Sequence, residues 1–199
     1  MEKPICQPCL RNQQAIYSVL NSRFTQPGSV LELASGTAQH AVYIATRMPH
    51  IKWYSTDIEH NLHGASLWIK DANLENLPAP IALDIASKNW PIEYADYGFA
   101  SNIMHYVSAK NIAQLFTGLS QTLPKNGLFI CYGPFNNNGF TSEGNAALHE
   151  WLQTEVNKEA GIKELSEVEA MAHEVGFQLN ENISMPANNH ILVFSKIRD

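Results

Sequence analysis

The chain has 199 residues, 45% of them hydrophobic, so it has the size of one ordinary domain and can bury a substantial core without disulfides or structural metals. Its 13 basic and 19 acidic residues give a formal net charge of −6 without basic runs, which disfavours nucleic acid as a partner. The sequence has no apolar signal-peptide core and no stretch of membrane-spanning length, so we expect a cytoplasmic protein with no membrane partner.

Three cysteines, Cys6, Cys9 and Cys131, are an odd number in a chain that needs no disulfide framework, and we expect reduced thiols. Cys6 and Cys9 form a C-x-x-C pair. A zinc site needs four ligands and no second pair exists, while a thioredoxin-like motif would follow a strand. We therefore expect neither a metal site nor redox chemistry at this pair.

Strand and helix patterns alternate along the chain, separated by turns rich in Gly, Pro and Asn. Short apolar or β-rich runs predict strands at residues 29–33, 51–56, 81–83, 97–101, 128–132, 177–184 and 191–196. Helical patterns are predicted at residues 39–47, 62–73, 109–123, 146–159 and 164–175.

This alternation is typical of an α/β fold of the doubly wound, Rossmann-like class, with a mostly parallel sheet and helices on both faces. The last two strands, joined only by the loop 185–190, should be antiparallel to each other. No repeat or linker interrupts the pattern, so we expect one domain over residues 1–199. Ile16, Val19 and Leu20 lie at helical spacing, so residues 1–27 are predicted to add a helical extension over the cleft.

Acidic residues end the second and third predicted strands, where ligands bind in open α/β sheets. Asp57 follows Gly36 by twenty-one positions (57 − 36), where a carboxylate can accept hydrogen bonds from both ribose hydroxyls of a nucleoside. Asp84 and the Ile85 amide can meet the adenine amino edge, while Ile58 and Ile85 offer apolar faces to the ring. The pattern therefore predicts a nucleoside site.

The turn after the first strand differs from a dinucleotide-binding turn, which has the pattern G-x-G-x-x-G. Gly36 is its single glycine, and Ala38 stands at the second glycine place. S-adenosylmethionine has no pyrophosphate, so its turn can be less glycine-rich, and Glu32 can orient turn amides or waters near the donor's amino acid end. The alternative is that Glu32 and Asp57 only cap helices and that Gly36 only serves a turn.

Polar residues also follow the fourth and fifth strands. Asn102, His105 and Tyr106 follow the fourth, beside the expected place of the donor methyl group, and a histidine of near-neutral pKa there can take a proton during transfer. Alternatively, His105 caps a helix or packs under the cofactor. Tyr132 and Pro134 end the fifth strand, and we interpret Tyr132, with His105 and Asn102, as a catalytic candidate.

The substrate wall is predicted from the ends of the fifth strand and of the final hairpin, which should face the same cleft. A packing aromatic and a β-turn are the structural alternatives for these two segments. The candidate substrate-binding residues are Tyr106, Tyr132, Pro134, Phe135, Asn188 and Asn189.

Several segments resemble the methyltransferase-like family catalogued as a domain of unknown function, over nearly the whole chain. The matching segments are Arg11-Asn12, residues 31–40, residues 102–105, Tyr132-Gly133-Pro134-Phe135, Gly161-Ile162 and residues 185–189. The resemblance implies a class I methyltransferase fold with seven strands in the order 3-2-1-4-5-7-6 and the last strand antiparallel, S-adenosylmethionine as donor and S-adenosylhomocysteine as product.

The expected cofactor contacts combine this resemblance with the strand-end residues. They are Arg11, Asn12, Glu32, Ala34, Ser35, Gly36, Thr37, His40, Asp57, Ile58, Asp84, Ile85 and Asn102. The sequence departs from the family pattern at Ala38, at Gly144-Asn145 and at Lys163-Glu164, which bears on cofactor binding and on the substrate loop.

The leading hypothesis is a methyltransferase that uses S-adenosylmethionine and acts on a small molecule, as a monomer or homodimer. A second hypothesis is a non-catalytic module that binds S-adenosylmethionine or a nucleoside. A third, an oxidoreductase linked to NAD or a nucleotide sugar, lacks both the glycines and a Tyr-x-x-x-Lys pair.

Overall fold

The computed structural model describes residues 3–198 and contains one seven-stranded sheet in the order β3-β2-β1-β4-β5-β7-β6. The first five strands run parallel, and β7 is antiparallel to both β5 and β6. The predicted α/β fold and strand order are therefore confirmed. The strands are β1 (Gly28–Leu33), β2 (Ile51–Asp57), β3 (Ile81–Ala82), β4 (Tyr97–Ser101), β5 (Leu128–Gly133), β6 (Phe177–Met185) and β7 (Asn189–Lys196).

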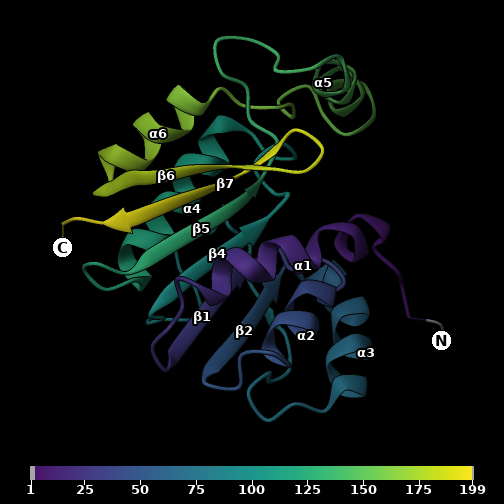
Figure 1. The fold of residues 1–199 in the computed structure, drawn as a ribbon, viewed down its shortest axis with the longest axis vertical. Coiled ribbons are helices and arrows are strands. Elements are labelled where there is room, and N and C mark those ends of the chain that lie inside the picture. The colour runs from purple at the N-terminus through teal and green to yellow at the C-terminus, as the bar shows by residue number, and fades with distance from the viewer. Residues whose placement is uncertain (1–2, 199) are drawn as a thin grey trace.

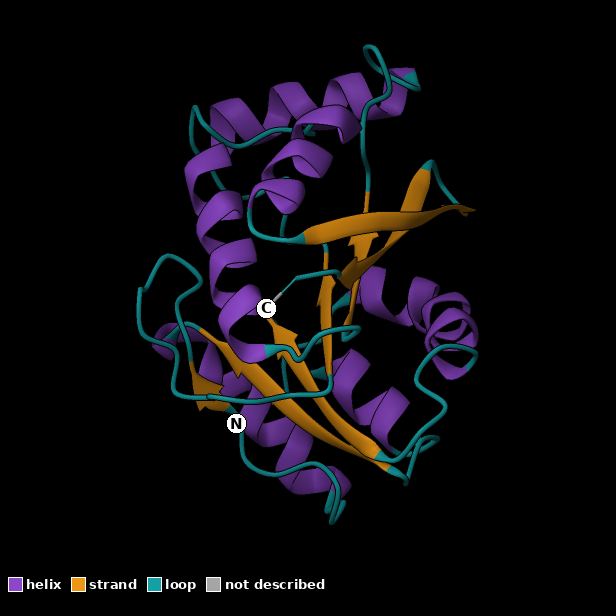
Figure 2. Ribbon diagram, turned by 90° about the vertical axis from the view of Figure 1, so that its left-hand side faces the viewer, coloured by secondary structure: helices purple, strands orange, loops and turns teal. Residues whose placement is uncertain are grey.

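Helices lie on both faces of the twisted sheet (Figures 1 and 2). They are α1 (Gln7–Asn21), α2 (Gln39–Ala45), the 3-10 turn η1 (Glu59–Asn61), α3 (Leu62–Ala72), α4 (Ala109–Thr122), α5 (Glu143–Glu155) and α6 (Leu165–Glu174). The start of α5 precedes the predicted one because the Ser142 hydroxyl accepts a hydrogen bond from the Asn145 amide and caps the helix there. None of the helices in residues 3–198 is both long and apolar enough to cross a membrane.

Two apolar clusters cover the two faces of the sheet. On one face α1, α2 and α3 pack over Trp53 and Phe99, with Ile16 and Leu20 of α1 fully buried. On the other face α4 and α6 cover the sheet, and Phe116 of α4 packs against Phe129, Phe177 and Phe194 of the strands. Because helices cover both faces, a ligand can enter the sheet region only at the ends of the strands.

The residues before α1 cross α3 before the helix begins, and we call residues 3–6 the N-terminal strap. The indole nitrogen of Trp68 donates a hydrogen bond of 2.7 Å to the Pro4 carbonyl, and Lys3 pairs with Asp71. Gly64 makes room for this crossing, since a Cβ there would lie 2.9 Å from the Pro4 ring. The strap is thus fixed on α3, beside the carboxyl end of the sheet (Figure 1).

The packing of α4 gives a test of the fold. Gly118 lies against the Trp90 ring, which a Cβ at this position would overlap. We expect Gly118→Ala to lower the free energy of unfolding by about 1 to 3 kcal/mol, measured by urea titration. Gly144→Ala is the matched control: its Cβ would meet only the Ser142 hydroxyl, at 3.8 Å, and alanine favours the helix. Equal effects of the two substitutions would contradict this packing.

Candidate functional site

Three adjoining cavities open at the carboxyl ends of β1 and β4, where the strand order reverses. We call them the central cavity (about 580 Å³), the nucleoside-side cavity (about 470 Å³) and the hairpin cavity (about 310 Å³). Asn102 lines all three. The fold therefore places these cavities at the strand ends that the sequence singled out.

The turn after β1 has the backbone of a glycine-rich turn although it contains one glycine. Ala34, Gly36 and Ala38 have φ values of 54°, 57° and 59°, in the left-handed region that disfavours side chains. The neighbouring strand holds this shape: the Ser35 amide donates to the Thr56 carbonyl at 2.9 Å. Ala38 thus adopts a left-handed conformation that glycine would favour, and the turn forms with alanine at this position.

Asp57 links this turn to the nucleoside-side cavity. Its carboxylate accepts hydrogen bonds from the Gly36 amide at 2.6 Å, from the Ile58 amide at 2.8 Å and from the Asn61 side chain at 2.8 Å. The side chain is 95% buried and lines the cavity. Two carboxylate oxygens offer about four acceptor positions, so one remains for a ligand hydroxyl. Asp57 therefore stabilises the turn rather than capping a helix, since neither α2 nor η1 has a side-chain cap, and its remaining acceptor position can contact a nucleoside.

The nucleoside-side cavity brings the other predicted nucleoside residues together. Ile58, Asp84 and Ile85 all line it. Ile85 is buried, whereas Ile58 is exposed, and one oxygen of Asp84 accepts the Ala86 amide at 2.9 Å. Other lining residues were not predicted as site residues from the sequence, including Asn61, Leu83, Val107 and Asn111.

Glu32 lies in the central cavity but not in the predicted way. One carboxylate oxygen accepts hydrogen bonds from the Trp53 indole at 2.8 Å and the Ser55 hydroxyl at 3.0 Å, rather than from turn amides. The side chain is almost fully buried, and burial raises its pKa to about 7 against the opposing effect of these two bonds. The expected contact with turn amides is wrong because β2 places both donors directly beside Glu32.

The helices α1 and α2 meet at the cleft, where α1 contributes Arg11 and Asn12 and α2 contributes His40. His40 Nε2 and the Asn12 side-chain oxygen are 2.7 Å apart, and burial lowers the pKa of His40 to about 4, so the ring is neutral at pH 7. Arg11 lines the central and hairpin cavities, His40 the central one and Asn12 the hairpin one. Arg11 thus supplies a positive charge at the cleft, and His40 positions Asn12.

His105 lies in the wall of the central cavity with Tyr106, whose ring centroid is 4.6 Å away. Its Nδ1 is buried and has no hydrogen-bond partner among the described residues. Burial, with a smaller effect of the Lys163 charge, lowers the pKa of His105 to about 4. The expected near-neutral pKa is therefore wrong, and His105 is a neutral, weakly basic side chain.

Two other catalytic candidates border the same cleft. Asn102 has a left-handed φ of 60°, which asparagine tolerates better than most residues. Its backbone N–H donates a hydrogen bond to the Tyr132 carbonyl at 2.8 Å. Tyr132 lines the hairpin cavity, and burial raises its pKa against a smaller opposing effect of a hydrogen bond with Asn12. The backbone of Asn102 is thus fixed on β5, and the Tyr132 side chain lies against α1.

Two predicted substrate residues do not line the cleft. Phe135 is buried in the apolar core on the α4 and α6 face, and Asn188 is an exposed turn residue with φ of 55°. Pro134 and Asn189 do line it, although the Asn189 side chain also donates to the Pro186 and Ala187 carbonyls of its own turn. The other wall comes from α5, through Asn145, which lies in the segment assigned to the substrate loop, and through Leu148, which no sequence pattern indicated.

The family model described as "Protein of unknown function (DUF938)" matches residues 3–196. The chain belongs to this family.

Solved structures share the fold of this DUF938 protein at low sequence identity. The S-adenosylmethionine-dependent methyltransferase SibL in its apo form has a TM-score of 0.76 and 22% identity, over 94% of this chain and 56% of that one. A putative O-methyltransferase from Nostoc punctiforme PCC 73102 gives 0.81 and 17%, over 94% and 56%. An O-methyltransferase family protein from Burkholderia thailandensis gives 0.81 and 15%, over 95% and 57%. The DUF938 chain spans little more than half the length of these proteins.

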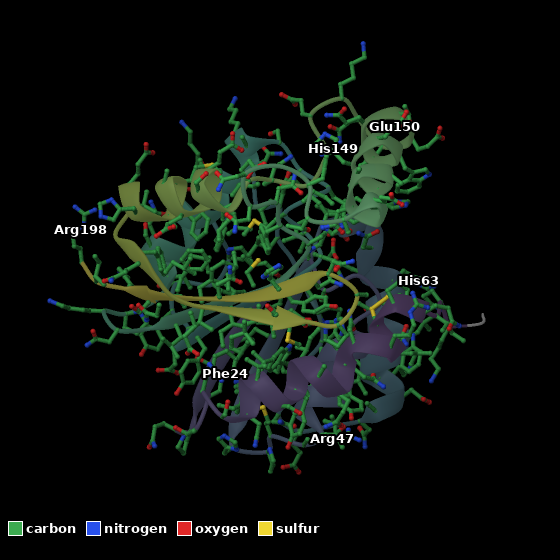
Figure 3. The ribbon with its side chains drawn as sticks, turned by 45° about the horizontal axis from the view of Figure 1, so that its top comes forward. Phe24, Arg47, His63, His149, Glu150 and Arg198 are labelled. Carbon is green, nitrogen blue, oxygen red and sulfur yellow. A yellow bond between two sulfur atoms is a disulfide. The ribbon has the colours of Figure 1, made fainter. Side chains whose placement is uncertain are left out.

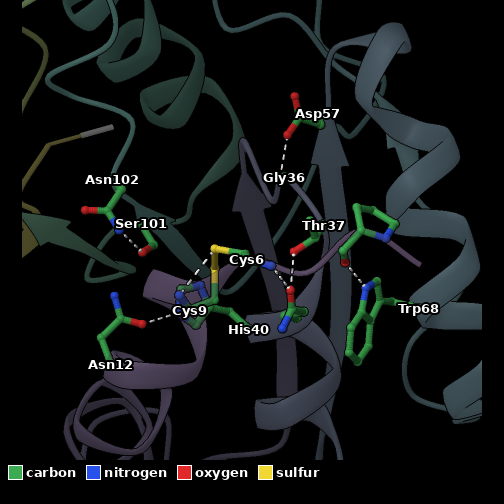
Figure 4. Close-up of a disulfide and its surroundings, with 12 residues drawn as sticks. Cys6, Cys9, Asn12, Gly36, Thr37, His40, Asp57, Trp68, Ser101 and Asn102 are labelled. Carbon is green, nitrogen blue, oxygen red and sulfur yellow. Dashed lines mark hydrogen bonds between the residues drawn. A yellow bond between two sulfur atoms is a disulfide. The ribbon is translucent and has the colours of Figure 1, made fainter. Parts of the chain in front are cut away.

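The cysteines of this DUF938 protein differ from the expectation. A disulfide joins Cys6 to Cys9 at the start of α1, so the expectation of three reduced thiols is wrong for this pair, whereas Cys131 is free and buried. Cys6 and Cys9 line the central cavity (Figure 4). Residues 3–198 contain no group of three or more His, Cys, Asp or Glu side chains placed to hold a metal ion.

Proposed function

We propose that this DUF938 protein is an S-adenosylmethionine-dependent methyltransferase that acts on a small molecule. Asp57 carries the proposal: its buried carboxylate holds the left-handed turn and borders a cavity that also contains Asp84 and Ile85. This combination of acceptors and an apolar wall suits a nucleoside, which donates hydrogen bonds from its ribose and offers a flat ring. The methyltransferases that share the fold support the same reading.

The charges along the cleft fit the rest of the donor. The adenosine part would occupy the nucleoside-side cavity, and the amino acid part the central cavity, where Glu32 can meet the ammonium group and Arg11 the carboxylate. A Cβ on Gly36 would meet no atom within 4 Å, so the turn backbone is open to a ligand. When bound, the donor supplies a methyl group on a positively charged sulfur.

The remaining walls suit the acceptor. His105, Tyr106 and Asn145 line the central cavity, and Tyr132 the hairpin cavity of about 310 Å³, a size that suits a small molecule. A neutral His105 can accept a hydrogen bond from an acceptor O–H or N–H and hold its lone pair toward the donor. Because its pKa is low, His105 contributes mainly by positioning the acceptor.

Transfer of an isotope-labelled methyl group tests this proposal. The protein is incubated with labelled S-adenosylmethionine and pools of small alcohols, phenols, amines, thiols and carboxylic acids, and products are separated by mass. We expect label in at least one low-mass product and the release of S-adenosylhomocysteine. Parallel assays contain protein or nucleic acid in place of the small molecules. Label that enters only these macromolecules would contradict a small-molecule acceptor.

His105→Ala should separate acceptor positioning from donor binding. With the acceptor found in that assay, we expect kcat to fall at least about tenfold, because the acceptor loses its hydrogen-bond partner, while the Kd of S-adenosylhomocysteine stays nearly unchanged. His190→Ala is the matched control, since His190 is on β7, pairs with Asn182 and lines none of the three cavities. Equal losses in kcat and donor affinity would make His105 a donor-binding residue instead.

A second candidate function is a module that binds the donor without turnover. The low pKa of His105 favours it, because a weak base takes a proton from an acceptor less readily. Donor binding by calorimetry without label in any acceptor pool would support this module over the methyltransferase.

A further inference from the structure

The C-x-x-C pair lies where the N-terminal strap meets the turn after β1, residues 34–38, which we call the donor turn. The Cys6 amide donates a hydrogen bond to the side-chain oxygen of Gln39, and the Thr37 hydroxyl donates to the same oxygen at 3.1 Å (Figure 4). Thr37 lines the central cavity, and Gln39 is buried at the start of α2. A displacement of Cys6 would therefore disturb the donor turn, because the Gln39 side chain connects Cys6 to Thr37.

The disulfide links the end of the N-terminal strap, at Cys6, to the first turn of α1, at Cys9. The strap is fixed on α3 through Pro4 and Trp68, and α1 begins immediately after Cys6, whose sulfur accepts the Cys9 amide at 3.2 Å. Figure 3 shows the sulfur–sulfur bond at the start of α1, next to the tip of the β6–β7 hairpin, and Asn189 of this hairpin lines the same cavity as the two cysteines. The bond thus holds together the strap, the first turn of α1 and the cavity wall.

Both cysteines are also suited to react. Cys6 and Cys9 are partly exposed, and both are at the N-terminal end of a 15-residue helix, where the helix dipole favours negative charge such as that of a thiolate leaving group. Cys131 is the internal contrast, because it is fully buried and burial raises the pKa of its thiol. An exchange reagent should therefore distinguish the pair from Cys131.

We propose that Cys6 and Cys9 form a reversible dithiol–disulfide site and that the disulfide form binds the donor more tightly; the second part rests on the proposed function. The co-reactant is a dithiol or glutathione-type thiol. Its thiolate attacks one sulfur of the pair, forms a mixed disulfide and releases the other cysteine as a thiolate, which takes a proton. A second thiolate of the reductant then attacks the reductant's own sulfur in the mixed disulfide and releases the second cysteine as a thiolate, which also takes a proton. Two electrons and two protons thus pass to the protein, and the reductant leaves as a disulfide.

A redox titration tests the first part without any donor. The full-length protein is equilibrated in glutathione buffers of varied thiol-to-disulfide ratio, alkylated and weighed by mass spectrometry. We expect the pair to pass reversibly between its two forms across these ratios, whereas Cys131 is alkylated only after denaturation. Cys131→Ala should give the same curve. A pair that stays in one form at every ratio would overturn the proposal.

Hydrogen exchange and calorimetry test the second part. In the reduced protein we expect faster exchange at residues 6–10 and 37–40, and a Kd for S-adenosylhomocysteine raised about five- to tenfold. The double variant Cys6→Ser/Cys9→Ser should match the reduced protein and ignore reductant. Equal exchange and equal Kd in both forms would overturn the link. Unequal exchange with no binding in either form would instead overturn the proposed function and retain the link from the pair to the turn.

Discussion

Asp57→Ala is expected to weaken the binding of S-adenosylhomocysteine by about 2 to 3 kcal/mol, or roughly 30- to 150-fold in Kd. The Asp57 carboxylate is buried, so its contact with a ribose hydroxyl would be a charged hydrogen bond shielded from water. The substitution also leaves the Gly36 amide without its acceptor, which loosens the turn that would face the donor. Isothermal calorimetry on the folded variant measures both losses together.

Asp96→Ala is the matched control for this experiment. Asp96 also holds a backbone amide, that of Ser29 at 2.7 Å, but it does so at the opposite end of β1 and outside the three cavities. We expect Asp96→Ala to lower the free energy of unfolding without changing the Kd. An unchanged Kd in Asp57→Ala would refute the ribose assignment, and a matching loss in Asp96→Ala would show that stability alone controls binding.

Glu32→Gln is expected to stabilise the ligand-free protein at alkaline pH and to weaken donor binding there. Burial raises the folded-state pKa of Glu32 to about 7 from 4.5, so the folded form binds the extra proton between these values. The stability from this protonation is fully present below pH 4.5 and is lost as pH rises through about 7, a change of order 3 kcal/mol. Glutamine keeps an acceptor for Trp53 and Ser55 and stays neutral.

Urea unfolding of both proteins measures this effect. The difference in stability between Glu32→Gln and the unsubstituted protein should be small near pH 5 and should grow in favour of the variant up to pH 8. The buried histidines His40 and His105, whose pKa values are lowered, act in the opposite direction but contribute equally to both proteins. Parallel stability curves would contradict the raised pKa of Glu32.

The affinity for the donor should depend on pH in the reverse sense. An ammonium group beside Glu32 favours the ionised carboxylate, so the Kd of S-adenosylhomocysteine should fall as pH rises from 6 to 8 and then level off. In Glu32→Gln this dependence should disappear, with binding at pH 8 weaker by about tenfold. A pH dependence that persists in the variant would assign it to another group.

The strand ends were predictable because each strand has a local signal. The β-rich run before Asp57 and the short apolar run before Asp84 end at those residues, and parallel strands bring their carboxyl ends to one edge. The positions of Asp57, Asp84, Asn102 and His105 at one cleft follow from that topology alone. The left-handed backbone at the centre of the turn was also predictable, because Gly36 is the residue type that favours this conformation.

The failures come from contacts between distant segments. Phe135 turns into the core because the next residue, Asn136, pairs with residues 163–165, and no local pattern announces that pairing. Glu32 meets Trp53 and Ser55 because of the register between β1 and β2, which places Glu32 opposite Ser55. The C-x-x-C pair lacks the context of a zinc or thioredoxin-like site, but Pro8 between the two cysteines is also compatible with a helix start, where Cys6 is the N-cap.

Calorimetric titration of the protein with S-adenosylmethionine, S-adenosylhomocysteine and NAD tests the proposed donor most directly. The geometry of Asp57, Glu32 and the turn predicts micromolar binding of the first two ligands and no binding of NAD, whose pyrophosphate would lie beside the buried Glu32. Failure of both methyl-donor ligands to bind to folded protein, or binding of NAD alone, would contradict the assignment.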